Sequence, residues 1–293
     1  MKFQYIIETP ILLRTFLQEN QYSKKMISAI KQSGALLVND TPVTVRKQMV
    51  QGDYLEVVLP SEVPSVNLEC FAKPITPLYE DDYYIAVSKP PHQNCAPSRE
   101  HPHESLLEQV LAYLNPNQQA PWVVPHIITR LDRNTSGIVL FAKHGHFHHR
   151  ISDVEMEKVY HCICFGQVEP HGEIIAPIAR ASDSIINREV SEAGKYAKTS
   201  YTLITQNQDY ALCRVQLHTG RTHQIRVHFQ YIGHPLVGDS LYGGYHEKAD
   251  AQSLVCTDLS FKHPVENKHV VLKDEARHAL IERLFRQLSN DKE

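Results

Sequence analysis

The stretch at residues 130–143, RLDRNTSGIVLFAK, places charged side chains directly before an apolar run. The run GIVLFA is short and rich in β-branched and aromatic residues, which predicts a buried strand. Before it, Arg130, Asp132 and Arg133 precede Asn, Thr, Ser and Gly, residue types that favour a tight turn with side chains bonded to the local backbone. We expect Gly137 to adopt a positive φ there. Charges so near a core are costly unless they are paired or used.

A rigid loop at a strand end is a common place for function. Taken alone, RLD is better explained as a turn capped by Asp132 with Arg130 as its surface partner. Only its context can favour a functional interpretation.

The long C-terminal part of the chain, residues 76–293, is rich in predicted strands. Residues 80–90 predict a turn followed by a strand. Further apolar and β-branched runs predict strands at 137–143, 158–166, 199–204 and 210–217, and 158–166 alternates like a half-buried strand. Helices are expected from the mid-140s to the mid-150s and at 221–233. Because strands and helices interleave without a strict β-α-β rhythm, we expect an α+β fold with a mixed, mainly antiparallel sheet.

The N-terminal part, residues 1–62, is predicted to be a separate small α/β unit. A first helix carries Leu12, Leu13, Phe16 and Leu17, and a second begins after a Ser23 cap and ends at Gly34. Short strands are expected at 36–38, 43–45 and 54–59. Residues 63–75 hold several prolines and no clear period, which is typical of a linker.

Charge patterning permits an anionic partner without requiring one. The whole chain has a net charge of −3. Residues 1–60 carry seven Lys and Arg against five Asp and Glu, with Lys24 and Lys25 on the second helix and Arg46 and Lys47 after the predicted hairpin. This pattern fits either a solvated charged face or an RNA contact, and the charges alone leave both open.

The location in the cell can also be predicted. The N-terminus has no clean signal-peptide core, and no run approaches the roughly 18 apolar residues of a membrane span. The six cysteines show no CxxC pair or disulfide-scaffold spacing. We therefore expect a cytoplasmic protein with reduced thiols.

Several stretches, in order, resemble the RluA/RluD-type pseudouridine synthases. RLDRNTSGIVLFAK resembles their catalytic motif. The others are LYEDDYYIAVSKPP (78–91), EKVYHCICFG (157–166), GKYAKTSY (194–201), HTGRTHQIRVHFQYIGHPLVGDSLYG (218–243) and LSFKHP (259–264). Residues 1–62 resemble the small αL-type RNA-binding domain shared with a ribosomal protein, except that Lys24-Lys25 stands where Arg is commoner.

The resemblance implies a role for each matching residue. Asp132 matches the catalytic aspartate, Tyr160 the tyrosine that stacks on the flipped base and assists proton removal, and Arg226 the arginine paired with the carboxylate. The implied RNA contacts are Arg130, which enters the RNA stack when the target uridine flips out, together with Arg221, His223, Lys24, Lys25, Arg46 and Lys47. Two departures concern substrate contacts only: Thr129 stands where the family usually has His, and the closing strand lacks its usual His.

The implied reaction converts uridine to pseudouridine in structured RNA, either rRNA or tRNA. It is an isomerisation without net redox change, so no cofactor or metal is implied. One carboxylate can perform it by covalent catalysis at either the ribose C1′ or the uracil C6, and the sequence does not choose between them. The target base must first leave the stack. No protein or membrane partner is implied, and we expect a monomer.

Two other functions compete with this one. The histidines of HGHFHHR (144–150) suggest a metal site, but His144, His146, His148 and His149 are expected on an exposed polar helix face, and no acidic or Cys cluster completes a ligand set. A non-catalytic RNA-binding relative is the second alternative. It is disfavoured because Asp132, Tyr160 and Arg226 are all present.

Overall fold

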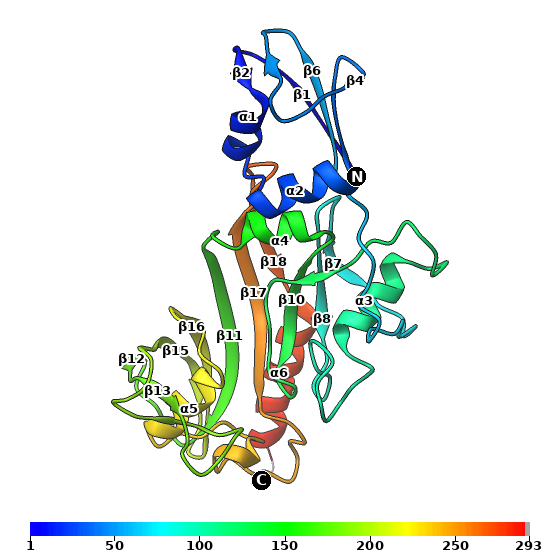
Figure 1. The fold of residues 1–293 in the computed structure, drawn as a ribbon. Coiled ribbons are helices and arrows are strands. Elements are labelled where there is room, and N and C mark those ends of the chain that lie inside the picture. Colours follow the sequence, from blue (N-terminus) through cyan, green and yellow to red (C-terminus); the bar gives the residue numbers. More distant parts are fainter. Residues whose placement is uncertain (291–293) are drawn as a thin grey trace.

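The chain folds into a small N-terminal unit and a larger unit built on one long sheet (Figure 1). The computed structural model describes residues 1–290. The last three residues of the predicted catalytic domain, 291–293, lie outside this range. Residues 59–76 join the two units and contain no helix or strand apart from a single bridge between Glu62 and Trp122.

The N-terminal unit packs two helices against a four-stranded antiparallel sheet of order β1-β6-β3-β4, with β2 and β5 forming a separate pair. Its elements are β1 (Lys2–Ile6), β2 (Ile11–Leu12), α1 (Leu13–Glu19), α2 (Lys24–Ser33), β3 (Ala35–Val38), β4 (Thr41–Pro42), β5 (Gln48–Met49) and β6 (Tyr54–Val58). The sequence did not predict β1. The strand predicted at 43–45 is wrong, because these residues form the loop whose carbonyl at Val45 accepts from the amide of Arg14.

The predicted caps of α2 are confirmed. The Ser23 hydroxyl accepts a hydrogen bond from the amide of Met26 at 3.1 Å, which satisfies one of the free N–H groups of the first turn. At the other end, a Cβ on Gly34 would lie 2.3 Å from the carbonyl oxygen of Val58. Only glycine therefore fits where the helix turns into the sheet.

Up to residue 290, the larger unit contains a ten-stranded mixed sheet and four helices. The main path of the sheet is β12-β15-β16-β11-β17-β10-β8-β7, with β18 on β17 and β9 on β10, and only β10 and β17 pair in parallel. The strands are β7 (Pro77–Glu80), β8 (Tyr84–Lys89), β9 (His126–Ile127), β10 (Ser136–Ala142), β11 (Met156–Phe165), β12 (His171–Ile175), β15 (Lys198–Gln206), β16 (Tyr210–Leu217), β17 (Leu254–Lys262) and β18 (His269–Lys273), with β13 (Ile178–Arg180) and β14 (Arg188–Val190) as a separate hairpin. The helices are α3 (Leu106–Leu114), α4 (Gly145–Ile151), α5 (Gln224–Tyr231) and α6 (Glu275–Ser289), and a 3₁₀ turn covers Ser240–Tyr242. The predicted α+β class is confirmed.

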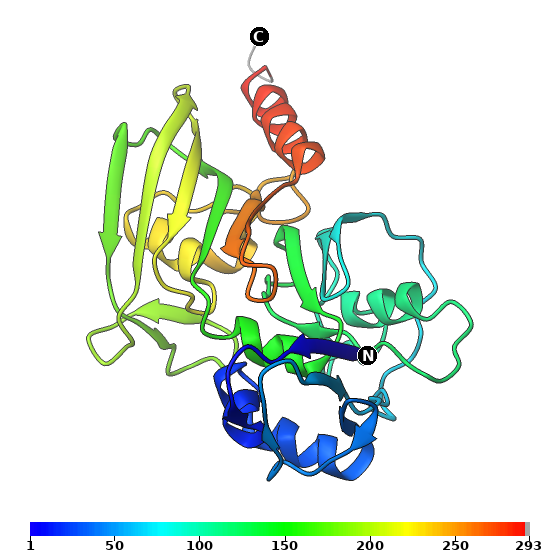
Figure 2. The same ribbon diagram turned by 90° about the horizontal axis from the view of Figure 1, so that it is seen from above.

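The middle of the sheet is covered on both faces, which corrects the prediction that residues 158–166 form a half-buried strand. On one face Tyr160 and Cys162 of β11 pack in a core that includes Phe229 of α5. On the other face Ile163 packs with Phe285 of α6. Figure 2 shows α6 and α5 on separate sides of the strands. The alternating side chains of β11 therefore point into two different cores, and neither face of the strand meets water at these positions.

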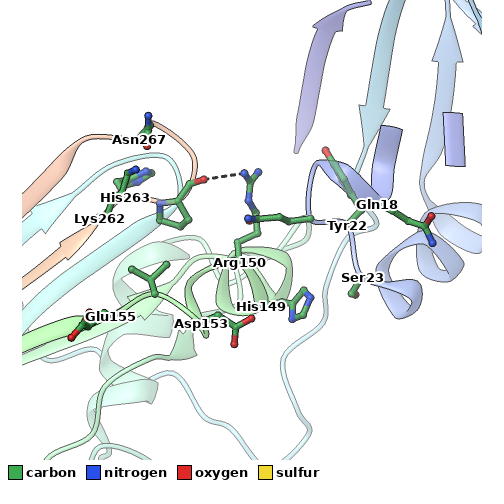
Figure 3. Close-up of a pocket in the computed structure, with 13 residues that line it drawn as sticks. Gln18, Tyr22, Ser23, His149, Arg150, Asp153, Glu155, Lys262, His263 and Asn267 are labelled. Atoms are coloured by element: carbon green, nitrogen blue, oxygen red, sulfur yellow. Dashed lines mark hydrogen bonds between the residues drawn. The ribbon is translucent and has the colours of Figure 1, made fainter. Parts of the chain in front are cut away.

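Helix α4 forms part of the contact between the two units, which corrects a second prediction. His148 and His149 are exposed as expected, but His144 and His146 are buried. His144 Nε2 lies 3.1 Å from the carbonyl oxygen of Pro60, and the ring of His146 stacks on Tyr22 at 4.5 Å between centroids. Figure 3 shows Arg150 of the same helix between the N-terminal helices and the loop that follows β17.

Candidate active site

Asp132 lies on a tight loop that enters β10. The amide of Thr135 donates to the carbonyl of Asp132 at 3.1 Å, which closes the turn. Gly137 follows with φ +113°, as predicted, and a Cβ there would lie 2.1 Å from the carbonyl oxygen of Cys256 on β17. Glycine therefore permits the parallel pairing of β10 with β17, and that pairing fixes the end of the strand beside Asp132.

The side chains of this loop do not bond their own backbone as predicted. The Thr135 hydroxyl accepts a hydrogen bond from Nε2 of Gln252 at 2.9 Å, and both residues are buried. The Oδ1 atom of Asn134 is buried without a partner among the described residues. The loop is therefore held partly by a distant segment, the turn before β17. Thr129, which stands where a His was expected, accepts from the amide of Leu140 at 2.9 Å.

A cleft of about 570 Å³ opens beside this loop. It is lined by Asp132 from the loop, Tyr160 from β11 and Arg226 from α5, and also by Arg130, Arg221 and His223. The structure thus brings together the three residues predicted to be catalytic, which come from three elements far apart in the sequence.

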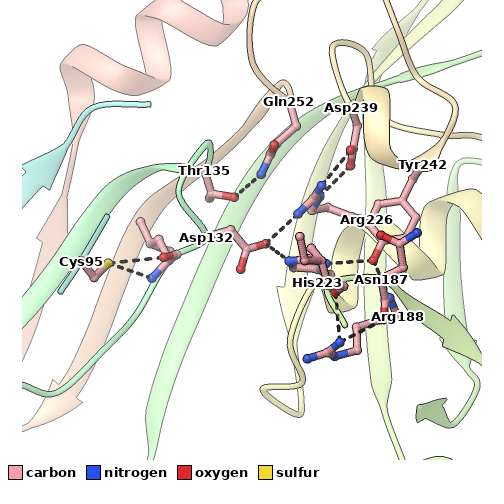
Figure 4. Close-up of polar contacts among 12 residues, drawn as sticks. Cys95, Asp132, Thr135, Asn187, Arg188, His223, Arg226, Asp239, Tyr242 and Gln252 are labelled. Carbon is pink, nitrogen blue, oxygen red and sulfur yellow. Dashed lines mark hydrogen bonds and ion pairs between the residues drawn. The ribbon is translucent and has the colours of Figure 1, made fainter. Parts of the chain in front are cut away.

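Arg226 joins two carboxylates. Its Nη1 donates to Oδ2 of Asp132 at 3.2 Å, while its Nε and Nη2 donate to the two oxygens of Asp239 at 2.7 and 2.8 Å (Figure 4). Burial opposes the charge of Arg226, but the bonds with Asp239 and Asp132 outweigh it and raise the pKa of the guanidinium. Asp239 is 1% exposed. The bidentate pair therefore fixes the guanidinium so that one N–H points at Asp132.

Asp132 has one bonded and one free oxygen. Its side chain is 29% exposed to solvent. Among the described residues, hydrogen bonds reach Oδ2 alone, and Oδ1 accepts none. A carboxylate held by one oxygen, on a side chain that lines a cleft, is well placed to act as a nucleophile.

His223 also lies near the carboxylate of Asp132. Its Nε2 lies 3.9 Å from Oδ2 of Asp132, too far for a hydrogen bond. Its Nδ1 lies 2.8 Å from the hydroxyl of Tyr242, which accepts from the amide of Arg188 at 3.0 Å. Burial lowers the pKa of His223, the nearby guanidiniums of Arg226 and Arg188 lower it further, and the Asp132 carboxylate partly opposes both. A neutral imidazole therefore borders Asp132 at pH 7.

Tyr160 lies where the β11–β17 ladder is irregular. The register shifts between Val159 and Tyr160, and such bulges re-aim side chains near functional sites. Tyr160 is 5% exposed. Burial, together with the adjacent Cys256 thiol and the Asp132 carboxylate, raises the pKa of Tyr160 well above its ordinary value. Its phenol therefore stays protonated at neutral pH.

The residues predicted to contact RNA fall into two groups. Arg130, Arg221 and His223 line the cleft with Asp132, and Arg130 is exposed and makes no hydrogen bond or ion pair with the described residues. Arg221 Nε donates to the carbonyl of Tyr196 at 2.9 Å. The other group is outside the cleft and exposed on the N-terminal unit: Lys24 and Lys25 at the start of α2, and Arg46 and Lys47 between β4 and β5.

Sequence reasoning missed two kinds of supporting residue. Asp239 and Tyr242 lie in the quoted stretch 218–243, and a lone Asp in an otherwise apolar segment was the available signal. Lys89 is fully buried, and its Nζ donates to the carbonyls of Pro90, Gln93 and Arg133 at 2.8–2.9 Å. Burial lowers the pKa of Lys89 to about 8, against the opposing effects of Cys95 and Asp132. Lys89 thus ties the residue after Asp132 to the loop that follows β8.

One group of possible metal ligands occurs among the described residues, away from the cleft. Ligand atoms of Asp81, His263 and Glu266 lie within 4.8 Å of one another. Both ring nitrogens of His263 are already used, because Nε2 lies 3.0 Å from Asp81 and Nδ1 accepts from the amides of Val265 and Glu266. Glu266 also pairs with Lys268 at 2.5 Å. These contacts explain the group as part of the turn after β17.

Comparison with known proteins gives this site a family. Residues 83–231 match the family described as RNA pseudouridylate synthase. A Bacillus subtilis protein named as an uncharacterized RNA pseudouridine synthase, YjbO, is 38% identical over 254 residues, which are 85% of this chain and 89% of that protein. The chain belongs to the RluA-type RNA pseudouridine synthases. It is therefore an isomerase that acts on RNA.

Two further proteins that resemble this pseudouridine synthase are named as pseudouridine or pseudouridylate synthases. The Haemophilus influenzae ribosomal large subunit pseudouridine synthase D is 29% identical over 229 residues, covering 76% of this chain and 70% of that protein. The structure of human RNA pseudouridylate synthase domain containing 1 superposes with a TM-score of 0.56 at 22% identity, covering 73% of this chain and 86% of that one. This last likeness shows the fold alone. Among residues 1–290, no helix has the length and apolar character needed to cross a membrane.

Proposed function

We propose that this pseudouridine synthase isomerises uridine in structured rRNA or tRNA, with Asp132 as the covalent catalyst. The observation that carries the proposal is the single free oxygen of Asp132. Oδ2 is held by Arg226, whereas Oδ1 accepts no bond from the described residues and belongs to a side chain that lines the cleft. Orientation of this kind is what a nucleophile needs.

The reaction can follow either of two routes. Asp132 attacks C1′ of the ribose and displaces uracil, or it adds to C6 of the uracil and turns the base while bound. In both, the N1–C1′ bond breaks, a C5–C1′ bond forms, C5 loses a proton, N1 gains one, and Asp132 leaves as a carboxylate. Neither route needs an oxidant or a metal, and we leave the choice between them open.

The target base must be flipped out of its stack to reach Asp132, at a cost of a few kcal/mol. Tyr160 is the proposed stacking surface, and base–aromatic stacking contributes roughly 1–3 kcal/mol. Its pKa is raised, so in the free enzyme Tyr160 suits stacking and donation better than proton removal. The exposed and unpaired Arg130 is proposed to fill the place that the base leaves.

The N-terminal unit is proposed to be an αL-type RNA-binding domain of residues 1–62, linked by residues 63–75 to a catalytic domain that begins at 76. Lys24, Lys25, Arg46 and Lys47 are exposed and form no ion pair with the described residues. They are therefore free to contact phosphates. We also propose that the enzyme works as a monomer in the cytoplasm and contacts no protein partner.

The RNA target is tested by mapping pseudouridines in cells with and without the gene. The Haemophilus relative is named for the large ribosomal subunit, so large-subunit rRNA is the first RNA to examine and tRNA the second. We expect one or more pseudouridines to disappear on deletion and to return with the wild-type gene. Unchanged maps in both RNA classes would contradict the proposed substrate class.

A further inference from the structure

A second cleft, of about 670 Å³, lies between the N-terminal unit and the catalytic unit. One wall comes from the end of α1 and the start of α2, including Gln18 and Ser23. The opposite wall comes from α4 and from the end of β17 with the turn that follows it, including Arg150 and Lys262 (Figure 3). It is comparable in size to the catalytic cleft and shares none of its lining residues.

The cation at the centre of this cleft is not neutralised. Arg150 uses one of its N–H groups, from Nη2, to donate to the carbonyl of Pro264 at 3.0 Å. Its Nε is buried without a partner, and no carboxylate of the described residues forms an ion pair with it. A guanidinium has five N–H donors, so most of its hydrogen-bonding capacity is unused. Lys262 is exposed and likewise unpaired.

The two carboxylates of the cleft do not cancel this charge. Asp153 and Glu155 line it too, but neither forms an ion pair with Arg150 or Lys262. In Figure 3 the Arg150 guanidinium points away from Asp153, and its bond to the Pro264 carbonyl holds it there. An anion is therefore favoured at the end of the cleft near Pro264.

We propose that this cleft holds a phosphodiester of the substrate RNA, bound by Arg150 and Lys262. This rests on the proposed function, in which the N-terminal unit contacts RNA. Arginine is well suited to phosphate because its N–H groups form a planar fork. Lys24 and Lys25 begin α2 beside the same wall, so the RNA backbone can continue from the cleft onto the N-terminal unit.

The position of the cleft bears on the size of the RNA. Asp132 precedes β10 and Arg150 follows it, and a strand of seven residues spans about 23 Å. An RNA that contacts both therefore has to bridge a distance of this order. An RNA too short to span this distance still reaches Asp132 but does not reach Arg150.

The test compares the salt dependence of RNA binding in the full chain. The probe is rRNA from cells that lack the gene, bound by wild type, by the Arg150→Gln/Lys262→Gln double variant, and by Arg283→Gln as a control on the exposed side of α6. Each lost phosphate contact lowers the slope of log K against log salt by about 0.7–0.9. We expect a fall of about 1.5 in the double variant, none in the control, and an unchanged single-turnover rate at saturating RNA.

Four further arms separate the alternatives. Arg150→Lys should keep the slope. If Arg150→Gln does not fold, Lys262→Gln alone replaces the double variant and should lower the slope by about 0.8. An RNA shorter than the span should bind wild type and the double variant equally. A slope equal to that of the control overturns the proposal, while an active wild type still supports the proposed function. Thermal stabilisation by inorganic phosphate that depends on Arg150, with an unchanged RNA slope, would assign the cleft to a free anion instead.

Discussion

Arg226 acts on Asp132 from a position that another residue fixes. Asp239 holds two of its nitrogens at 2.7 and 2.8 Å, against 3.2 Å for the single contact with Asp132. The guanidinium also lies 4.9 Å from the ring of Tyr242. The strongest contacts of Arg226 are therefore those that orient it, and Asp239 is a positioning residue.

Asp239→Asn should lower the single-turnover rate at least tenfold while the RNA dissociation constant stays within about twofold. The amide keeps the shape of the carboxylate but offers one acceptor where the guanidinium needs two, so Arg226 can turn away from Asp132. Loss of a buried pair also costs stability, of the order of 3–5 kcal/mol, and the assay must stay below the lowered melting temperature. Asp82→Asn on the surface is the control. A folded Asp239→Asn with the wild-type rate would show that Arg226 needs no such anchor.

Among single elements, helix α4 shows that a polar sequence pattern can include a buried side chain. HGHFHHR contains four histidines and suggests a polar face, but His146 is 1% exposed and lies on Tyr22. Neither of its ring nitrogens has a partner among the described residues. Burial, with Arg150 and the neighbouring histidines, lowers the pKa of His146 to about 3. The ring therefore packs as a neutral aromatic group.

His146 should make the protein lose stability in acid. Its pKa is about 3 when folded and about 6.5 in an unfolded chain, so its contribution is complete above pH 6.5 and is lost as the pH falls toward 3. At pH 5 this loss amounts to about 2 kcal/mol. His146→Phe keeps the ring and removes the titration. Denaturant unfolding at pH 7.5 and pH 5 should show the wild type losing about 2 kcal/mol more than the variant, and equal losses would contradict the burial of a neutral His146.

The differences between the predicted and the observed elements show which features the sequence can predict. Turn and cap chemistry is local, so the Ser23 cap, the end at Gly34 and the positive φ of Gly137 were all predicted. Strand β11 was placed correctly but was predicted to be half-buried. Alternation of side chains along a strand looks the same whether one face meets water or both faces meet separate cores. His146 was misplaced because its burial depends on Tyr22, more than a hundred residues earlier. Asp239 was missed because its partner is defined only when α5 and the following turn fold together.

In the whole molecule, the basic residues of the N-terminal unit that are proposed to contact RNA lie outside the cleft that holds Asp132. Lys24 and Lys25 are on α2, which faces α4 in Figure 1, while Arg46 and Lys47 lie in the loop beside the start of α1. The contact between the units is aromatic, with Phe3 stacked on Tyr83 at 6.3 Å. Such a contact favours one orientation of the N-terminal unit, and under the proposed function a folded RNA would meet both surfaces together.

Neutralising the basic residues of the N-terminal unit should weaken RNA binding without slowing chemistry. We expect Lys24→Gln/Lys25→Gln and Arg46→Gln/Lys47→Gln each to lower the salt slope by about 1–2, because each removes up to two phosphate contacts. Salt-dependent binding of rRNA by the full chain measures this, with single-turnover rate at saturating RNA as the second readout. If both variants keep the wild-type slope, the N-terminal unit is not an RNA contact.

The central claim is that Asp132 performs the isomerisation, and the single-turnover rate of pseudouridine formation by Asp132→Asn tests it most directly. The assay uses the RNA identified by mapping, with Asp82→Asn as the control and RNA binding measured alongside. Asn matches Asp in shape but is not a nucleophile, so the fold and RNA affinity should be kept while pseudouridine formation is abolished. An Asp132→Asn variant that retains even a tenth of the wild-type rate would contradict the account.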